Sequence, residues 1–431
     1  MGRFLIIQND AIIVLMRLNF LSANKISQML EKIREDFSIS AMLAGLIALF
    51  ATYSGPVLIV VQAAQAGHLS QAALSTWIWA LSMGAGLVGL VLTLRYKVPV
   101  IGAWSTPGVA LLISGLAQFQ FSEVIGCYLV LALVVTALGF SGLFGWIMAR
   151  VPVNLLSAMI AGVLFEFCAR IFQSMQVVPA LVLPIILAYV AMRRMLPRYA
   201  VAGALAVGLV CSYAGNQVNM QALDVHLAHP QAVMPEFSLR ALVGLGLPLI
   251  LLALTQYASS IHILRNAGYD IPAKAVVGVS GLLSIPLSIF GNCGINPAAI
   301  VGAICASSEC HADPSRRYVS GVVAGIGYLC VGIFGASVIA LFSTFPHAFT
   351  ATLAGLALLG TLATSLSSSL ADDRRESALI TFLVTVSGMS FLGLGSALWG
   401  IVAGTVFGAV MSWAKPVAVS GPVQSEPVAQ K

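Results

Sequence analysis

Residues 98–108, with the sequence VPVIGAWSTPG, decide how this chain folds. The segment lies among apolar stretches, yet its two prolines, two glycines and two small hydroxyl residues make a poor continuous helix. Val98 is expected to be extended, because a residue that precedes proline avoids the helical region. Ser105 and Thr106 stand where a helix cap would, just before Pro107, so a helix of residues 109–117 is predicted to follow.

A second segment of the same design surrounds Asn296 and Pro297, where glycines and polar residues precede a small-residue helix predicted at 298–306. Non-helical backbone at membrane depth is tolerated only where protein buries it or where it lines a cavity. The N-terminus of such a half-helix offers free N–H donors and a partial positive charge. Either segment alone could be a loop or a kinked packing helix. Two such interrupted segments, at matching places in the two halves of the chain, predict a transporter binding site that suits an anion.

The composition is that of a membrane protein. The 431 residues are 59% hydrophobic and 8% charged, and the mean hydropathy is +0.98. The seven cysteines are scattered singly, so no metal site or disulfide framework is expected. The net charge of +6 is attributed to basic residues in short loops rather than to a nucleic-acid partner.

The apolar runs predict an all-α polytopic membrane protein with about fourteen transmembrane segments. If the N-terminus is cytoplasmic, every lysine and arginine except Arg170 and Arg240 falls on the cytoplasmic side. Both termini are therefore predicted to lie inside a bacterial inner membrane. No cleavable signal peptide is expected. The segments are placed at 39–63, 74–94, 98–116, 123–148, 152–175, 177–192, 199–219, 240–264, 274–290, 294–307, 318–342, 348–370, 377–392 and 393–413.

The polar connection at 220–239 divides the chain into seven spans before it and seven after it. An odd number of spans per half inverts the second half, so a 7+7 inverted repeat is predicted, with two broken helices that carry short extended segments at the midplane.

Glu166 and Arg170 are the charged residues placed most deeply in a span, at i,i+4 spacing on one helix face. They are either a mutually neutralising structural pair or a pair that handles protons or substrate charge. A second charged group, formed by His311, Asp313, Arg316 and Arg317, is expected to be a solvated cytoplasmic turn.

Gln256 and Tyr257 lie in mid-helix, beside Thr255 and Ser259, where they could bind a ligand or bond neighbouring helices. Tyr53 interrupts the first span and has the same two interpretations. The sequence contains no nucleotide-binding, zinc-protease or nucleophile-elbow motif, so neither an enzyme nor a cofactor is expected.

These motifs resemble the bacterial benzoate membrane transport family, whose members are benzoate/proton symporters. The resemblance rests on Tyr96–Val100, on the Trp104–Gly108 block, on Gln256, on Asn266–Tyr269 and on the Ala298–Cys305 segment. The family is similar in fold to nucleobase and sulfate transporters, which divide into core and gate domains. That likeness implies a lead-in (1–37), a first core segment (38–150), a first gate segment (151–219), an external linker (220–239), a second core segment (240–342), a second gate segment (343–414) and a tail (415–431).

The resulting hypothesis is secondary active transport, with protons, of benzoate or a related aromatic carboxylate by alternating access. The alternatives are transport of another small anion or a nucleobase on the same fold, or a membrane-embedded enzyme. A homodimer is suggested only by analogy with the fold. The expected substrate-binding residues are Ser105, Thr106, Pro107, Gln256, Tyr257, Asn296, Tyr53 and Trp104, the last either as a wall for the ring or as a packing residue. Glu166 and Arg170 are the candidates for proton or charge coupling.

Overall fold

The computed structural model describes residues 23–54, 56–149, 152–215, 227–308, 310–335, 337, 345–371, 374–389, 391–392 and 394–413. The predicted lead-in as far as residue 22, the linker at 220–226 and the tail at 415–431 lie outside these residues. The division into core and gate domains therefore stays a prediction.

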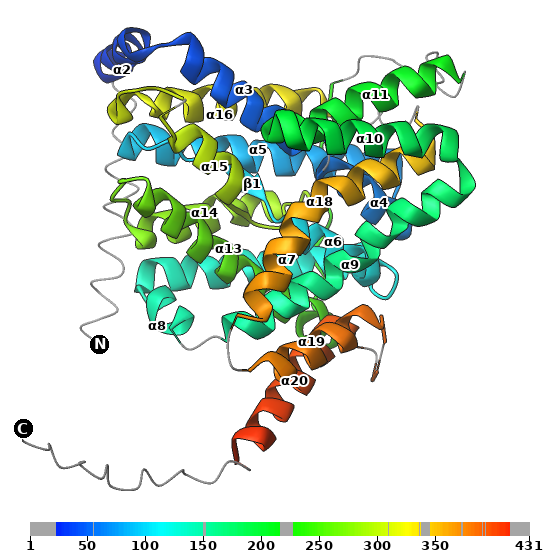
Figure 1. Cartoon of the computed structure of the whole chain (residues 1–431). Helices are drawn as coiled ribbons and strands as arrows, with labels where there is room; N and C mark the ends of the chain where they lie inside the picture. Colours follow the sequence, from blue (N-terminus) through cyan, green and yellow to red (C-terminus); the bar gives the residue numbers. More distant parts are fainter. Residues whose placement is uncertain are drawn as a thin grey trace, which may run out of the picture.

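Most of the described residues are helical, and the helices form one bundle (Figure 1). The first half contains α2 (Ala23–Asp36), α3 (Ile39–Ser54), α4 (Pro56–Ala66), α5 (Gln71–Tyr96), β1 (Gly102–Trp104), α6 (Thr106–Leu116), α7 (Phe121–Ser141), α8 (Phe144–Met148), α9 (Val153–Val177), α10 (Pro179–Met195), η2 (Pro197–Tyr199) and α11 (Ala200–Ala214). The second half contains α12 (Leu239–Ala241), the π-helical η4 (Leu242–Gly246), α13 (Leu247–Asn266), α14 (Ala273–Ser288), β2 (Ile295–Pro297), α15 (Ala299–Ala306), η5 (Pro314–Arg316), α16 (Tyr318–Ile333), α18 (His347–Ser369), α19 (Arg375–Val386) and α20 (Ser396–Trp413).

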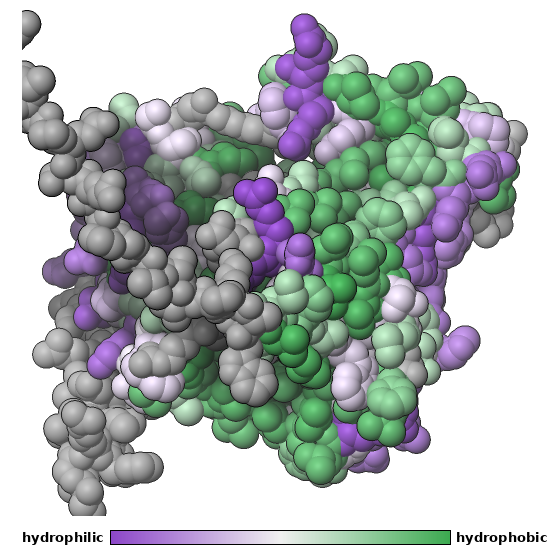
Figure 2. Space-filling view, turned by 60° about the horizontal axis from the view of Figure 1, so that its bottom comes forward, coloured by the Kyte–Doolittle hydropathy of each residue, from purple (hydrophilic) through white to green (hydrophobic). Residues whose placement is uncertain are grey.

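Six helical stretches in the described residues are long and apolar enough to cross a membrane. They are Ile39–Ala66, Gln71–Tyr96, Phe121–Ser141, Val153–Val177, Leu239–Asn266 and His347–Ser369, and shorter apolar helices accompany them. Figure 2 shows a broad apolar surface on which hydrophilic residues gather mainly towards the edges. The membrane-protein class is confirmed, whereas the count of fourteen segments stays a prediction.

One predicted span is divided. The stretch 123–148 forms α7 and α8, because Gly142 ends α7 in the left-handed conformation, with φ of 74°.

Both interrupted segments form the predicted extended backbone, and the two extended pieces pair with each other. β1 and β2 are antiparallel, with Ala103 opposite Asn296 and Trp104 opposite Ile295. In Figure 1, β1 lies in the middle of the helix bundle. Pairing satisfies backbone groups that would otherwise be exposed to an apolar interior, which is why two broken helices are stable there together.

Close contact with α5 fixes the position of β1. The hydroxyl of Thr93 donates to the carbonyl of Val100 at 3.0 Å and accepts from its N–H at 3.1 Å, so the chain folds back along α5. At Gly102, a Cβ atom would clash with the backbone carbonyl of Ala85. Glycine is therefore required at this point of β1.

The helix ends gather in two separate groups, as expected if successive spans run in alternating directions. The stretch 227–236 bonds to the ends of four helices, through N–H groups that reach Thr76 of α5, Ser122 of α7, Ile289 after α14 and Ile333 of α16. The other ends of α5 and α16 meet α2 and the residues after α13 around a shared cavity. The two groups of helix ends agree with neighbouring spans that run in opposite directions. Which end faces the cytoplasm stays a prediction.

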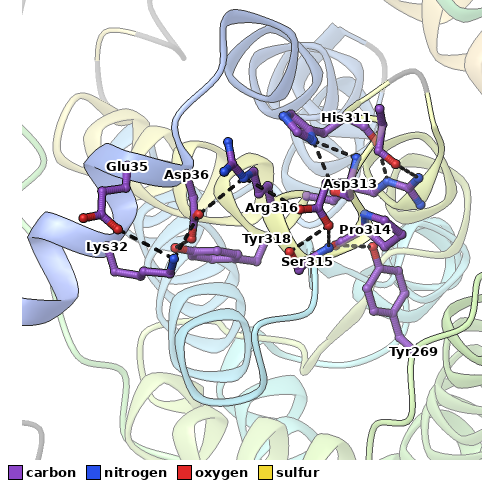
Figure 3. Close-up of polar contacts among 12 residues, drawn as sticks. Lys32, Glu35, Asp36, Tyr269, His311, Asp313, Pro314, Ser315, Arg316 and Tyr318 are labelled. Carbon is purple, nitrogen blue, oxygen red and sulfur yellow. Dashed lines mark hydrogen bonds and ion pairs between the residues drawn. The ribbon is translucent and has the colours of Figure 1, made fainter.

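Asp36, the last residue of α2, anchors that amphipathic helix to the bundle. Figure 3 shows its carboxylate among Lys32, Arg316 and Tyr318. Tyr318 donates to it at 2.9 Å, and the nitrogens of Lys32 and Arg316 lie at 3.4 and 3.6 Å. The Lys97 ammonium lies over the ring of Tyr318, 4.0 Å from its centroid, and burial lowers the pKa of this lysine.

The interpretation of the 311–317 group as a solvated turn is wrong for Arg317. Its side chain is buried, with only 8% of the residue exposed, and it donates to the carbonyls of Ala306, His311 and Ala312. Arg316 and Asp313 are exposed, as expected for a solvated turn. Sequence alone could not separate two adjacent arginines, because only the fold brings the end of α15 against one of them.

Asp36→Asn is expected to lower the free energy of unfolding by roughly 1.5–3 kcal/mol, because it weakens charged hydrogen bonds to a buried carboxylate. Thermal unfolding of the purified protein in detergent measures the change. Glu35→Gln is the matched control, since that side chain is 71% exposed and its pair with Lys32 is worth about 0.5 kcal/mol. Equal stability of the two variants would contradict the anchoring role of Asp36.

Candidate functional site

A small cavity lies where the paired strands meet α7, α13 and α14. Its volume, about 10 Å³, leaves room for about one water molecule. Ligand pockets measure roughly 300–1,000 Å³, so this space is too small to hold an organic ligand. The polar members of its lining are Ser105, Tyr257, Ser284 and Asn296, and the apolar members include Leu131, Val135, Leu249 and Ala253.

Ser105 caps the half-helix α6, as the sequence predicts. Its oxygen accepts from the N–H of Gly108 at 3.0 Å, and Pro107 occupies the first turn. Since the oxygen accepts in this bond, the Ser105 hydroxyl proton is free to donate. Thr106, the first residue of α6, is half-buried.

The half-helix α15 begins differently. Its N-cap residue, Ala298, has no side chain that can accept a hydrogen bond from the first turn. The N–H of Ala298 itself donates to Ile101 at 2.7 Å, and the Asn296 amide donates to the carbonyl of Pro297 at 3.3 Å. The first turn of α15 therefore has backbone donors that no capping side chain occupies.

The antiparallel pairing sets the relation between the two half-helices. α6 starts just beyond one end of the strand pair, and α15 starts just beyond the other. Three residues of strand measure about 10 Å, so both N-termini lie close to the same small region. Their dipoles add positive potential to this region without a buried lysine.

Helix α13 holds β2 through side chains three residues apart. Tyr257 donates to the carbonyl of Ile295 at 2.6 Å, and Ser260 donates to the carbonyl of Pro297. Sequence reasoning chose Ser259 instead of Ser260, but Ser259 is exposed and bonds back to Thr255. The i,i+3 spacing from Tyr257 is the signal that could have identified Ser260.

Gln256 precedes Tyr257 on α13 and does not line the cavity. Its side-chain amide oxygen is buried and has no hydrogen-bond partner among the described residues. A buried amide oxygen without a partner costs about 1–3 kcal/mol, and this oxygen can only accept a hydrogen bond, so it favours a ligand group that donates one.

Tyr53 and Trp104 lie together, in an aromatic group completed by Tyr328. The Tyr53 ring meets Trp104 edge-on at 5.5 Å between centroids, and Tyr328 lies 5.8 Å from Tyr53. The Tyr53 hydroxyl bonds to Ser82 at 2.5 Å. Neither predicted residue lines the cavity, and sequence reasoning did not include Tyr328.

Glu166 and Arg170 are not brought to this site. They form an ion pair on α9 with an N–O distance of 2.6 Å, and the Glu166 side chain is 65% exposed. Neither residue lines the cavity.

The arrangement can hold an anion with an apolar body. Hydroxyl and amide donors meet two helix N-termini beside apolar walls, and the described residues contain no cluster of His, Cys, Asp or Glu that could hold a metal ion.

Comparison with known proteins gives a consistent picture. The family model described as "Benzoate membrane transport protein" matches residues 35–410. The chain is 38% identical over 378 residues to the benzoate membrane transport protein of Acinetobacter baylyi, covering 87% of this chain and 96% of that protein. It is 37% identical over 367 residues to the inner membrane protein YdcO of Escherichia coli, covering 85% and 94%.

Solved structures share the fold at low sequence identity. SLC26A9 matches with a TM-score of 0.59 and 13% identity, over 86% of this chain and 65% of that one. The transmembrane domain of the cyanobacterial bicarbonate transporter BicA matches with a TM-score of 0.55 and 14% identity, over 85% and 97%. At these identities the likeness concerns the fold alone.

Proposed function

Because the chain belongs to the benzoate membrane transport family and is a membrane transporter rather than an enzyme, we propose that it takes up benzoate, or a closely related aromatic carboxylate, together with protons. Uptake would proceed across a bacterial inner membrane by alternating access. The relative from Acinetobacter baylyi carries benzoate in its name.

The meeting of two half-helix N-termini at one strand pair carries this proposal. Benzoate is an apolar ring with one carboxylate, and α6 and α15 direct free N–H groups and partial positive charge to a single region. The antiparallel strands also agree with halves that travel in opposite directions, as the proposed inverted repeat requires.

We assign the carboxylate to the first turns of the two half-helices. The Ser105 hydroxyl has a proton to donate, and Thr106 and Asn296 lie at the same two helix starts. Gln256 supplies a side-chain amide, whose nitrogen is the atom that can donate to a carboxylate. Tyr257 and Pro107 shape the site, the first by holding β2 and the second by starting α6, while Trp104 of β1 meets the Tyr53 ring edge-on.

Alternating access fits the small size of the cavity. An aromatic acid cannot occupy about 10 Å³, so the surrounding helices must separate before the ligand binds. Helices α9 and α18 pack extensively on each other, and so do α7 with α14 and α5 with α16, whereas α9 contacts α6 and α13 much less. We therefore infer that α9 and α18 move as one group relative to α5, α7, α14 and α16.

Proton coupling is assigned to the Glu166–Arg170 pair, which the sequence singled out. Both residues lie within α9, one of the helices that contacts α6 and α13, and an ionisable pair within a membrane span is a functional candidate by default. A homodimer remains a proposal by analogy with the fold.

Competition for uptake separates the leading proposal from transport of another small anion or a nucleobase. Radiolabelled benzoate uptake by proteoliposomes is measured with excess unlabelled benzoate, sulfate, bicarbonate or uracil. We expect inhibition by benzoate alone. If benzoate fails to compete and one of the others is itself taken up, the alternative on the same fold is correct.

Thr106→Ala and Gln256→Ala are each expected to weaken benzoate affinity by roughly ten- to a hundredfold, since a hydrogen bond to a charged group is worth about 1.5–3 kcal/mol. Equilibrium binding to purified protein measures the effect. Ser259→Ala is the control on α13, because that hydroxyl is exposed and bonds only within its own helix. Unchanged affinity in both test variants would remove these residues from the site.

A further inference from the structure

We propose that Arg317 is a positioning residue for the half-helix α15, and that it sets benzoate affinity from the opposite end of that helix. This inference rests on the proposed function, because it assumes that the N-terminus of α15 contacts the substrate. Arg317 itself touches neither the cavity nor the strand pair.

Helix α15 needs support from outside itself. It has eight residues, which is too short to be stable alone in water, and its N-cap has no side-chain hydrogen bond. The other half-helix, α6, has a serine cap at its start, and backbone N–H groups of residues 117–119 close its last turn. The last turn of α15 is likewise closed by Ser307, which donates to Ile304, so the two half-helices differ in the cap at their start.

Arg317 closes the C-terminal end of α15. Its Nη1 donates at 2.7 Å to the carbonyl of Ala306, the last residue of the helix. Its Nε donates at 2.7 Å to His311, and its Nη2 donates at 3.3 Å to Ala312. One planar guanidinium thus ties the helix end to the turn that follows it, which a lysine ammonium cannot do with the same geometry.

The charge of Arg317 also points to α15. No carboxylate among the described residues lies within ion-pair distance of this buried guanidinium. Arg317 is the N-cap residue of α16, where a positive charge opposes the dipole of that helix. The same charge is favourable at the C-terminus of α15. The placement of Arg317 therefore stabilises the end of α15 and destabilises the start of α16.

The turn that carries Arg317 is itself anchored. Tyr269, after α13, donates to the carbonyl of Pro314 at 3.0 Å, and the neighbouring Tyr318 holds Asp36 of α2, as Figure 3 shows. Because this turn is anchored, loss of the Arg317 contacts would allow the C-terminal end of α15 to move relative to the turn. The start of α15 would then be held only by the bond of Ala298 to Ile101 and by β2, and the first-turn amides beyond that bond would shift relative to α6.

The test compares Arg317→Lys and Arg317→Gln with Arg316→Lys, the same change at the adjacent and exposed arginine. Initial rates of benzoate uptake by proteoliposomes give KM and the maximal rate for each protein. We expect both Arg317 variants to raise KM by roughly ten- to a hundredfold while the maximal rate per inserted protein stays near that of the wild type. Arg316→Lys should leave both unchanged.

Hydrogen–deuterium exchange provides an independent measurement. Amides of residues 302–306 should exchange faster in Arg317→Lys, whereas those of α6 should not change. A lower maximal rate at unchanged KM, unchanged exchange in α15, or failure of both Arg317 variants to insert while Arg316→Lys inserts would each overturn the positioning role. If wild-type protein transports no benzoate, the proposed function fails, and the exchange comparison still tests whether Arg317 holds α15.

Discussion

Ser105→Asp is expected to lower benzoate affinity by at least about a hundredfold. Aspartate is as good an N-cap as serine, so it can accept the Gly108 N–H and preserve the start of α6. It also places a negative charge where the substrate carboxylate is expected. Two like charges 4 Å apart repel by about 4 kcal/mol at an effective dielectric constant of 20. Equilibrium binding to detergent-purified protein measures the loss.

Ser105→Asn is the matched control, because asparagine caps a helix equally well and carries no charge. It should stay within about tenfold of the wild type in affinity, since at most one hydrogen bond changes. If the aspartate variant inserts into the membrane normally and binds benzoate with unchanged affinity, the site is not at the start of α6.

Gly102→Ala is expected to have the second-largest effect. A Cβ atom at this position meets the backbone carbonyl of Ala85, and neither backbone can yield without separating β1 from α5. Such overpacking costs about 1–3 kcal/mol of stability. Displacement of β1 also moves the first turn of α6, so benzoate affinity should fall by roughly a hundredfold. Thermal unfolding and equilibrium binding report the two effects separately.

Gly145→Ala serves as the control for this substitution. Nothing lies within 4 Å of a Cβ atom at Gly145, which belongs to the short helix α8. Alanine in a helix is favoured over glycine by up to about 1 kcal/mol, so this variant should be as stable as the wild type or slightly more stable. If Gly102→Ala behaved in the same way, the close packing of β1 on α5 would not determine the site.

Local chemistry explains which features of the site could be predicted. The cap at Ser105, the proline in the first turn of α6 and the extended stretch before them follow from preferences of neighbouring residues. The same preferences placed a short helix after Pro297, and the structure has it one residue later than expected. For Glu166 and Arg170, the helical spacing was sufficient to predict the contact between them.

Contacts between distant segments could not be predicted in this way. The pairing of Ala103 with Asn296 depends on how two halves of the chain meet, and no local pattern encodes that register. Ser260 and Tyr257 take their roles from the carbonyls of β2, which reach α13 only in the fold. Arg317 was interpreted as solvated because its partners are carbonyl groups, which have no signature in a sequence.

Accumulation of radiolabelled benzoate in proteoliposomes tests the central claim most directly. The purified protein is reconstituted with an alkaline interior, and protein-free liposomes of the same composition measure leakage of the undissociated acid. We expect uptake above that leakage, to an internal concentration that exceeds the external one, and its abolition by a proton ionophore. Uptake that only equilibrates benzoate, at the same rate with and without the pH gradient, would contradict proton-coupled transport.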